Sequence, residues 1–262
     1  MKMDNHNVTD LNSDGLPFFK KNSKAYAESL THRSGDDLSV LIDRLPDGEG
    51  IRALDVATGT GFTGFRLAQK YKLVVGLDVT SEMLQEARNF SIKKKMDNIV
   101  FVLGRSEKMP FLNDTFDVVT CRRAAHHFTD RERFVGEVRR VLRQGGTFGF
   151  VDMVSPDNDI NDSFNKLERL RDPTHLSAGT KTFWEKTLSK AGFIINFSQT
   201  FQERISFEKW LSPVRPDDDA GKKCRNYLEK NEPLKKMLSF QDDSIIKTRL
   251  VMTSISAGIK ET

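Results

Sequence analysis

Cysteine and long apolar runs are scarce in this 262-residue chain. Its two cysteines, Cys121 and Cys224, are too few for a disulfide framework or a thiolate metal site, and they suit a reducing cytoplasm. The longest apolar runs, such as Leu73–Val75 and Phe101–Leu103, are far too short to span a bilayer. The first ten residues are polar and lack the apolar core of a signal peptide. We therefore expect a cytoplasmic protein without a membrane span and without a metal centre.

Neither sign of charge dominates the sequence. Lys and Arg number 41 and Asp and Glu 37, so the formal net charge is only +4. Such a small surplus gives weak support for nucleic-acid binding. The chain does contain ample apolar volume, including 19 phenylalanines. Its length suits one large domain with a real core, extended by insertions or a small cap.

Strand and helix patterns alternate between residues 52 and 153. The expected strands are Arg52–Ala57, Leu73–Val79, Ile99–Leu103, Asp117–Cys121 and Thr147–Met153. The expected helices are Phe65–Lys70, a helix capped by Ser81, and Arg131–Leu142, which ends at a turn formed by Gly145–Gly146. This alternation predicts parallel strands joined by crossover helices. Because the strands are nearly continuous apolar runs, both faces of the sheet should be covered.

The pattern changes on either side of this region. Residues 1–50 are expected to contribute helices to the pocket, with a helical pattern over residues 18–45 and acids in a first turn at Asp36 and Asp37. Residues 51–262 should form the main domain. Within it, cap insertions are expected near residues 155–180 and 206–245, because the second is too long for an ordinary connection.

Further elements are expected after residue 155. They are helices at Phe164–Arg171 and over residues 182–191, a sixth strand at Phe193–Arg204, and a last strand at Arg249–Ile259. Prolines break the polar helical segment 206–245 at Pro213, Pro216 and Pro233.

A glycine-rich turn carries most of the functional argument. Gly59, Gly61 and Gly64 match G-x-G-x-x-G between a strand and a helix, a pattern that binds adenosine cofactors. A dinucleotide would set its pyrophosphate at the start of that helix. Asp55, just before the turn, would oppose a phosphate and suits a cofactor with a positive sulfonium and a free amino group. Asp78, at the tip of the second strand, can accept hydrogen bonds from ribose hydroxyls in either cofactor type.

Four stretches resemble class I S-adenosylmethionine-dependent methyltransferases, in particular the small-molecule group that includes the ubiquinone and menaquinone C-methyltransferases. They are LDVATGTGFTG, VVGLDVTSEML, EKMPFLNDTFDVVTCRRAAHHF and VLRQGGTFGFVDM, which follow the family's order and spacing over roughly residues 50–155. The resemblance implies an α/β, Rossmann-like fold. Its mostly parallel seven-stranded sheet would have helices on both faces, a last antiparallel strand and a helical cap. The resemblance is specific for the cofactor and says little about the substrate.

The resemblance also implies a set of residues that bind S-adenosyl-L-methionine. They are Asp55, Ala57, Thr58, Gly59, Thr60, Gly61, Asp78, Val79, Met83, Ser106, Glu107 and Arg122. Asp55 and the turn backbone would hold the methionine part, and Asp78 the ribose. Val79 and Met83 would flank the adenine. The sequence departs from the family at Arg105, where an acid usually follows the third strand.

His126, His127 and Asp152 are the candidate catalytic residues. Histidine can accept a proton near neutral pH, and the pair follows the fourth strand at the edge where open sheets bind ligands. Asp152 ends the fifth strand and should face the substrate pocket. Methyl transfer depends mainly on alignment, so packing or cofactor contact is the alternative role for the two histidines. His175 could line the cap.

The predicted function is in-line methyl transfer from S-adenosylmethionine to a small organic molecule. An RNA methyltransferase is one alternative, although base N-methyltransferases place an Asn/Asp-Pro-Pro-aromatic turn after the fourth strand and this chain has Cys121–Ala124 there. A nicotinamide-dependent oxidoreductase shares the glycine turn but is disfavoured by Asp55. A degenerate binding protein that keeps the fold is a further alternative. The acceptor atom and the oligomeric state, a homodimer included, are left open.

Overall fold

The computed structural model describes residues 17, 19, 35–159, 161–212 and 214–256. Most of the expected N-terminal helical segment, up to residue 34, lies outside these residues. Its last part forms helix α3 (Asp36–Asp43), which begins with the two acids Asp36 and Asp37. The last three residues of the strand expected at Arg249–Ile259 also lie outside the described part.

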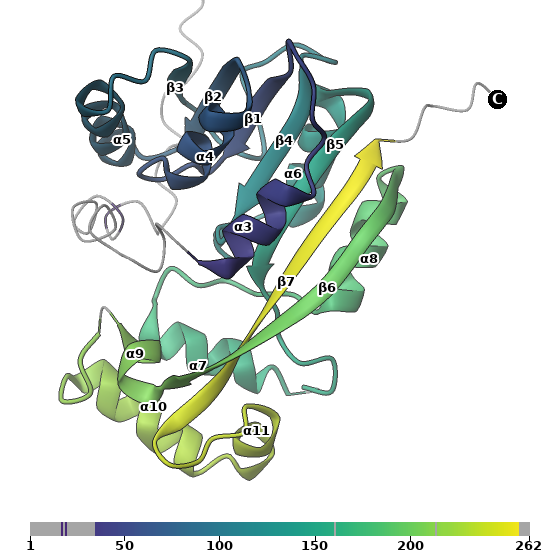
Figure 1. Ribbon diagram of the computed structural model, residues 1–262. Helices are drawn as coiled ribbons and strands as arrows, with labels where there is room; N and C mark the ends of the chain where they lie inside the picture. The colour runs from purple at the N-terminus through teal and green to yellow at the C-terminus, as the bar shows by residue number, and fades with distance from the viewer. Residues whose placement is uncertain (1–16, 18, 20–34, 160, 213, 257–262) are drawn as a thin grey trace, which may run out of the picture.

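A seven-stranded sheet forms the centre of the molecule (Figure 1). Its strands are β1 (Arg52–Val56), β2 (Leu73–Asp78), β3 (Ile99–Leu103), β4 (Phe116–Arg122), β5 (Leu142–Met153), β6 (Phe193–Ser206) and β7 (Ser244–Ser256). They are arranged in the order β3-β2-β1-β4-β5-β7-β6. The first five pair in parallel, and β7 is antiparallel to both β5 and β6. The predicted mostly parallel sheet with a last antiparallel strand is therefore confirmed.

Helices pack on both faces of this sheet. Helix α3 lies with α4 (Phe62–Lys70) and α5 (Ser81–Lys93) on one face, while α6 (Arg131–Val141) and α8 (Lys181–Lys190) cover the other. Apolar residues at helical spacing point from each helix into the core, as Phe134 and Trp184 do. Burial of each such side chain contributes about 2 kcal/mol relative to exposure.

Four helices form a separate body beyond the end of the sheet at which β5 finishes (Figure 1). This body, called the cap below, consists of α7 (Ser163–Arg171), α9 (Phe207–Leu211), α10 (Asp219–Glu229) and α11 (Glu232–Met237). It has its own apolar cluster, which includes Leu167, Phe207 and Leu228. The apolar packing of the cap is therefore separate from the two apolar clusters that lie between the sheet and the helices on its two faces.

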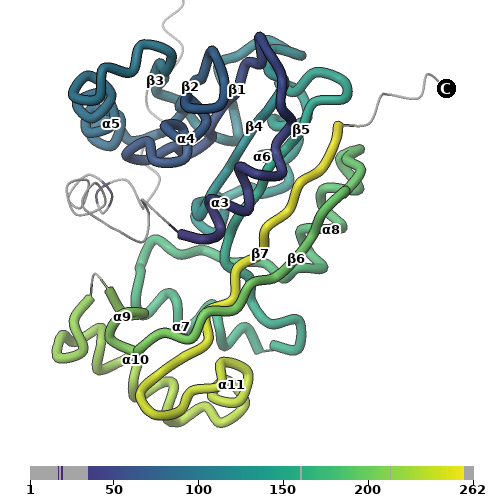
Figure 2. Tube along the Cα trace, viewed as in Figure 1, coloured from purple at the N-terminus to yellow at the C-terminus, as the bar shows by residue number. Residues whose placement is uncertain are grey.

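Strands β6 and β7 connect the sheet to the cap. The pairing of β5 with β7 ends at Met153 and Arg249, whereas β6 and β7 continue together to Ser206 and Ser244. Figure 2 shows the two strands running side by side from the sheet into the cap. Residues near position 247 therefore lie where the sheet edge meets the cap.

Four local predictions were wrong. Ser81 does not cap α5, because Thr80 is the N-cap residue and the Ser81 hydroxyl donates to Glu82 instead. The Gly145–Gly146 pair lies inside β5, which already starts at Leu142. Pro233 does not break a helix but stands in the first turn of α11, where its missing N–H has no helical partner to lose. Strand β7 starts five residues before the predicted Arg249.

The described part of the chain contains neither a membrane-spanning helix nor a candidate metal site. None of them is both long and apolar enough to span a bilayer. Within the same residues, His, Cys, Asp and Glu side chains form no group of three or more suited to hold a metal ion.

Candidate active site

The turn between β1 and α4 has an unusual backbone. Ala57, Gly59 and Gly61 all have positive φ angles, of 54°, 55° and 93°. Glycine adopts such angles at little cost, whereas Ala57 stores strain on the order of 1 kcal/mol. A side chain added at Gly59 would meet no atom within 4 Å, so the outer face of the turn is open. The turn thus presents bare backbone to any ligand that approaches this edge of the sheet.

Asp55 lies beneath this turn and is almost completely buried. Its carboxylate accepts hydrogen bonds from the hydroxyls of Thr58 (2.6 Å) and Thr120 (2.8 Å), and from the backbone N–H of Gly64. Burial raises the pKa of Asp55 to about 6, although these bonds and the nearby Arg122 oppose the shift. The side chain is therefore turned into the fold, where it braces the turn. Its predicted action on a cationic ligand would have to operate through charge rather than direct contact.

Asp78 lies beside the turn at the end of β2. Its Oδ2 accepts from the Gly59 N–H at 2.8 Å, and its Oδ1 accepts from the Thr80 N–H at 2.9 Å. Burial raises the pKa of Asp78, against these hydrogen bonds. The Thr80 hydroxyl and the Val79 N–H also act on this carboxylate as donors, so a ribose hydroxyl would bind Asp78 in place of one of its present donors. Close by in sequence, Val79 is partly buried and Met83 is buried on α5.

Ser106 and Glu107 follow β3 at the same edge of the sheet. The Ser106 hydroxyl donates to Glu107 Oε2 at 2.9 Å, and the Thr129 hydroxyl donates to Oε1 at 3.0 Å. Glu107 thus ties the loop after β3 to the loop after β4. Arg105 also approaches Glu107, with 4.0 Å between its Nε and Oε2.

Two adjacent arginines at the end of β4 bind one acid from α3. Asp37 accepts from the Nε and Nη2 atoms of both Arg122 and Arg123, at distances between 2.7 and 3.1 Å. Burial alone would raise the pKa of Asp37, but the two guanidinium groups outweigh it and hold the pKa well below its usual range. The pairing fastens α3 to the carboxyl end of β4. It also occupies one side of Arg122, which was predicted to lie near the methionine part of the cofactor.

Replacing Asp37 by alanine should destabilise the protein by about 3 kcal/mol, because two largely buried guanidinium groups would lose their partner. Urea unfolding at neutral pH would measure this loss. Since the folded-state pKa of Asp37 is lowered, its contribution exists above its ordinary value of 3.8 and should fade as the pH falls below it. Asp47→Ala is the control, because its carboxylate is almost fully exposed beside Lys70. A variant at Asp37 as stable as this control would contradict the account.

His126 and Asp152 form a close pair between the ends of β4 and β5. His126 lies in a short 3-10 turn, Ala125–His127. Its Nδ1 is 2.6 Å from Asp152 Oδ1, and its backbone N–H donates to Oδ2 at 3.1 Å. Burial alone would raise the pKa of Asp152, but His126 outweighs it, so the pKa lies below its usual value. An ionised Asp152 requires the proton on Nδ1, which leaves Nε2 of His126 as the proton-accepting nitrogen.

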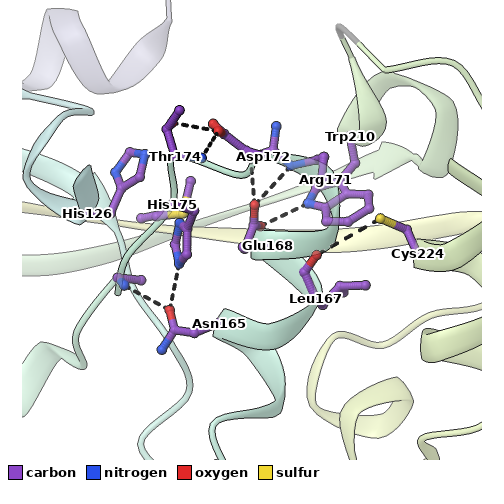
Figure 3. Close-up of polar contacts among 12 residues, drawn as sticks. His126, Asn165, Leu167, Glu168, Arg171, Asp172, Thr174, His175, Trp210 and Cys224 are labelled. Atoms are coloured by element: carbon purple, nitrogen blue, oxygen red, sulfur yellow. Dashed lines mark hydrogen bonds and ion pairs between the residues drawn. The ribbon is translucent and has the colours of Figure 1, made fainter. Parts of the chain in front are cut away.

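Two further imidazoles surround this pair. The ring of His127 is centred 4.0 Å from that of His126, and the ring of His175 is 5.4 Å away. Figure 3 shows His126 and His175 on neighbouring segments, with Asn165 bound to His175. Burial and His126 lower the pKa of His175 to about 4, and the same causes lower that of His127. Both rings are therefore neutral near neutral pH.

His175 is almost fully buried and has a fixed tautomer. Its Nε2 is 2.8 Å from Asn165 Oδ1, which also accepts from the Ala178 N–H, so Nε2 must carry the proton. The Nδ1 atom of His175 has no hydrogen-bond partner among the described residues. A buried acceptor without a partner is costly, so it marks a place where a ligand or water donor would be favourable.

A single family model covers all parts of this candidate site. They are the glycine turn, Asp78 and the buried His126–Asp152 pair. The family described as "Methyltransferase domain" has a sequence model that matches residues 47–207. This chain belongs to the class I S-adenosylmethionine methyltransferases.

This methyltransferase is similar to several bacterial proteins. It is 34% identical over 211 residues to the uncharacterized methyltransferase YcgJ of Bacillus subtilis, which covers 80% of this chain and 83% of the relative. The crystal structure of YcgJ superposes with a TM-score of 0.80 at 28% identity, over 85% of this chain and 99% of that one. A putative methyltransferase from Bacillus halodurans gives the same TM-score at 31% identity, over 86% and 100% of the two chains.

Sequence reasoning missed several residues that shape the site of this methyltransferase. The Thr120 hydroxyl donates to Asp55, but the sequence alone does not distinguish Thr120 from the other residues of a buried strand. Asp37 was interpreted as an acid at the start of a helix, and its arginine partners lie 85 and 86 residues away. The adjacent arginines at the end of a buried strand were an available signal, because two cations in that position need a buried acid.

Proposed function

We propose that this methyltransferase moves the methyl group of S-adenosylmethionine to a small organic molecule. The observation that carries the proposal is the open glycine turn with Asp78 beside it, at the carboxyl ends of β1 and β2. Ligands of open α/β sheets bind at this edge. The residues fit the cofactor, because the turn offers backbone to a close ligand and the Asp78 carboxylate lies at the end of β2, where ribose hydroxyls could replace some of its present donors. When bound, S-adenosylmethionine supplies an electrophilic methyl group on a positively charged sulfur.

The remaining cofactor contacts follow from the same edge of the sheet. The backbone of Ala57–Gly61, including Thr58 and Thr60, would hold the methionine part, and Arg122 lies at the end of the adjacent strand β4. Val79 and Met83 would flank the adenine. Ser106 and Glu107 would reach the adenine edge. Asp55 would favour the cationic sulfur through its buried charge.

The His126–Asp152 pair is suited to accept a proton from the methyl acceptor. An acceptor that takes the methyl group from this sulfur would have to release a proton from its nucleophilic atom. The proton that the nucleophile loses would pass to Nε2 of His126. Asp152 would stabilise the resulting imidazolium through the 2.6 Å contact at Nδ1. His127 would pack against this ring and keep it in place.

A small-molecule acceptor is supported by the names of two relatives. The sterol 24-C-methyltransferase of Schizosaccharomyces pombe is 33% identical, over 80% of this chain and 55% of the relative. The ubiquinone/menaquinone C-methyltransferase of Hahella chejuensis is 34% identical, over 44% and 49%. We also propose that residues 1–50 line the pocket and that residues 51–262 form the catalytic domain, with the cap closing over the acceptor. A small formal charge of +4 gives little support to an RNA substrate.

Calorimetric titration with S-adenosylhomocysteine tests the proposed function. We expect micromolar binding to the full chain, and a loss of about 30-fold or more in Asp78→Ala, because the ribose hydroxyls lose a charged acceptor. Asp97→Ala, in the turn before β3, is the control and should bind normally. Absence of binding at millimolar ligand, or binding of NADH instead, would contradict the proposal. Label transferred from S-adenosylmethionine to a panel of phenols, hydroxy acids, amines and activated carbon acids would then identify the acceptor.

A further inference from the structure

Three imidazole rings pack together at the carboxyl end of β4. The ring of His126 contacts both of the others, with its centre 4.0 Å from that of His127 and 5.4 Å from that of His175. The backbone holds this arrangement, because the carbonyl of His126 accepts from the N–H groups of Leu176 and Ser177 at 3.0 and 3.1 Å. The loop after α7 is therefore fixed against the proposed catalytic pair. The three histidines are called the imidazole cluster below.

The tautomer of His127 is set by its neighbours. Its Nδ1 lies 3.0 Å from the carbonyl oxygen of Thr174, which can only accept, so Nδ1 must carry the proton. The Thr174 hydroxyl, 3.1 Å from the same nitrogen, donates its own proton to Asp172 at 2.6 Å (Figure 3). Nε2 of His127 is therefore an acceptor, and the residues that the structure describes form no hydrogen bond to it.

The other two rings of the imidazole cluster present the same chemistry. Asp152 keeps the proton of His126 on Nδ1, and Asn165 keeps that of His175 on Nε2. Each ring thus has one unprotonated nitrogen and no N–H left to donate. Burial lowers the pKa of His127 and His175, so neither gains a second proton near neutral pH. The imidazole cluster can accept hydrogen bonds from a ligand but cannot donate any.

Two acids stand behind the imidazole cluster. Asp152 binds one of its rings directly, and Asp172 is connected to another through the Thr174 hydroxyl. Neither acid forms an ion pair with a lysine or arginine in the described part of the chain. The arginines that act on them electrostatically have other partners, which are the loop after α7 for Arg131 and an acid of α7 for Arg171. A cation bound at the imidazole cluster would therefore be stabilised by two negative charges.

The spacing of the acceptor nitrogens indicates how many donors a ligand should carry. Ring centres 4.0 Å apart place Nε2 of His126 and of His127 within reach of one ligand atom, because two hydrogen bonds of about 3 Å can span the gap. A hydroxyl has one proton and can satisfy only one of these nitrogens, whereas an ammonium group has three. Nδ1 of His175, buried and without a partner among the described residues, is a third acceptor beside His126.

We propose that the methyl acceptor is a small-molecule amine, which binds as its ammonium ion and donates N–H groups to Nε2 of His126 and of His127. The inference rests on the proposed function and adds the chemical class of its substrate. One N–H bond then breaks. Its proton passes to Nε2 of His126, and its electron pair stays on the nitrogen as the lone pair that receives the methyl group. His126 is then the catalytic residue and His127 a substrate-binding residue.

Matched sets of acceptors test this proposal. Each set contains an amine, an alcohol and a carboxylic acid on the same carbon skeleton, such as benzylamine, benzyl alcohol and benzoic acid. Aliphatic and aromatic skeletons of increasing size cover the unknown shape of the pocket. With labelled S-adenosylmethionine and the full chain, we expect kcat/KM for the best amine to exceed that of its alcohol and acid by about tenfold or more.

Two failures of this experiment are distinguishable. If S-adenosylhomocysteine binds but the label goes mainly to an alcohol, an acid or a carbon acid, or to no amine, the proposal fails and the methyltransferase function stands. Failure of S-adenosylhomocysteine itself to bind would overturn both.

His127→Phe keeps a ring against His126 but removes the acceptor nitrogen. It should raise KM for the best amine by about tenfold or more, while kcat and the affinity for S-adenosylhomocysteine change little. Thr174→Val is the matched control, because it also removes a hydrogen bond from Nδ1 of His127 but leaves Nε2 in place. An unchanged KM in His127→Phe, or an equal rise in Thr174→Val, would overturn the proposal.

Nuclear magnetic resonance of the wild type, with nitrogen-15-labelled histidine, gives a test that no variant can disturb. Nε2 of His126 and of His127 should carry no proton in the free protein, and both resonances should move when benzylamine or the best amine is added with S-adenosylhomocysteine. A proton on either Nε2 in the free protein, or resonances that stay in place, would contradict the proposal.

Discussion

Replacing Asp152 by asparagine is expected to slow methyl transfer by about 10²- to 10⁴-fold, which is the range that a positioned proton acceptor contributes. In the wild type, the ionised carboxylate keeps the proton of His126 on Nδ1, 2.6 Å away. The asparagine amide can present its N–H group to Nδ1 instead. That donor would favour the other tautomer, with Nε2 protonated and unable to accept a proton.

Single-turnover kinetics with labelled S-adenosylmethionine and the identified acceptor would measure the effect. Asp152→Asn should lower the rate constant for methyl transfer while its affinity for S-adenosylhomocysteine stays close to that of the wild type. His126→Gln should cost about as much, and the double variant little more, because the two residues act as one unit. Asp219→Asn, exposed on α10 beside Lys223, is the control. Wild-type turnover in Asp152→Asn would reduce the pair to a structural role.

The Asp55→Asn variant should be more stable than the wild type and should bind S-adenosylmethionine more weakly. Burial raises the pKa of Asp55 from 3.8 to about 6, so the stability that its protonated form confers is full below 3.8 and is lost as the pH rises through 6. At neutral pH the ionised carboxylate therefore costs about 3 kcal/mol, which asparagine would largely remove. An amide can still accept from Thr58 and from the Gly64 N–H.

Comparison of two ligands isolates the charge of Asp55 from its role in the turn. S-adenosylmethionine has a positive sulfur and S-adenosylhomocysteine a neutral one. Asp55→Asn should weaken the first by about tenfold more than the second, because a buried charge acts on a cation over several ångströms. Wild-type affinity for S-adenosylmethionine should also fall as the pH drops through 6, where Asp55 gains its proton. Equal losses of affinity for both ligands would show that Asp55 only stabilises the glycine turn.

The sequence predicted the sheet well because its signals are local. Each of the first five strands is a short apolar run ended by a polar or glycine-rich turn, and β3 was placed at its observed bounds, Ile99–Leu103. Strand β7 was started late because Lys247 and its neighbours interrupt the apolar pattern. That interruption occurs where the strand leaves the sheet and pairs with β6 beside the cap. Local periodicity has no signal for a strand whose surroundings change along its length.

The candidate site was predictable only in part. His126 and Asp152 were expected at the ends of adjacent strands, and such ends meet at one edge of a parallel sheet. The orientation of Asp55 could not be read from sequence, because it depends on Thr120 from another strand. The place of His175 beside His126 depends on the loop after α7, and loop geometry has no periodic signature. Contacts between distant segments were therefore the part that pattern analysis could not supply.

We expect the open turn, Asp78 and His126 to form one cofactor and reaction site. A crystal structure of the full chain with S-adenosylhomocysteine tests this most directly. We predict that the ligand crosses the Gly59 turn, with its ribose hydroxyls on the Asp78 carboxylate and its sulfur on the side that faces His126. A ligand bound elsewhere, or a sulfur directed away from His126, would contradict the account.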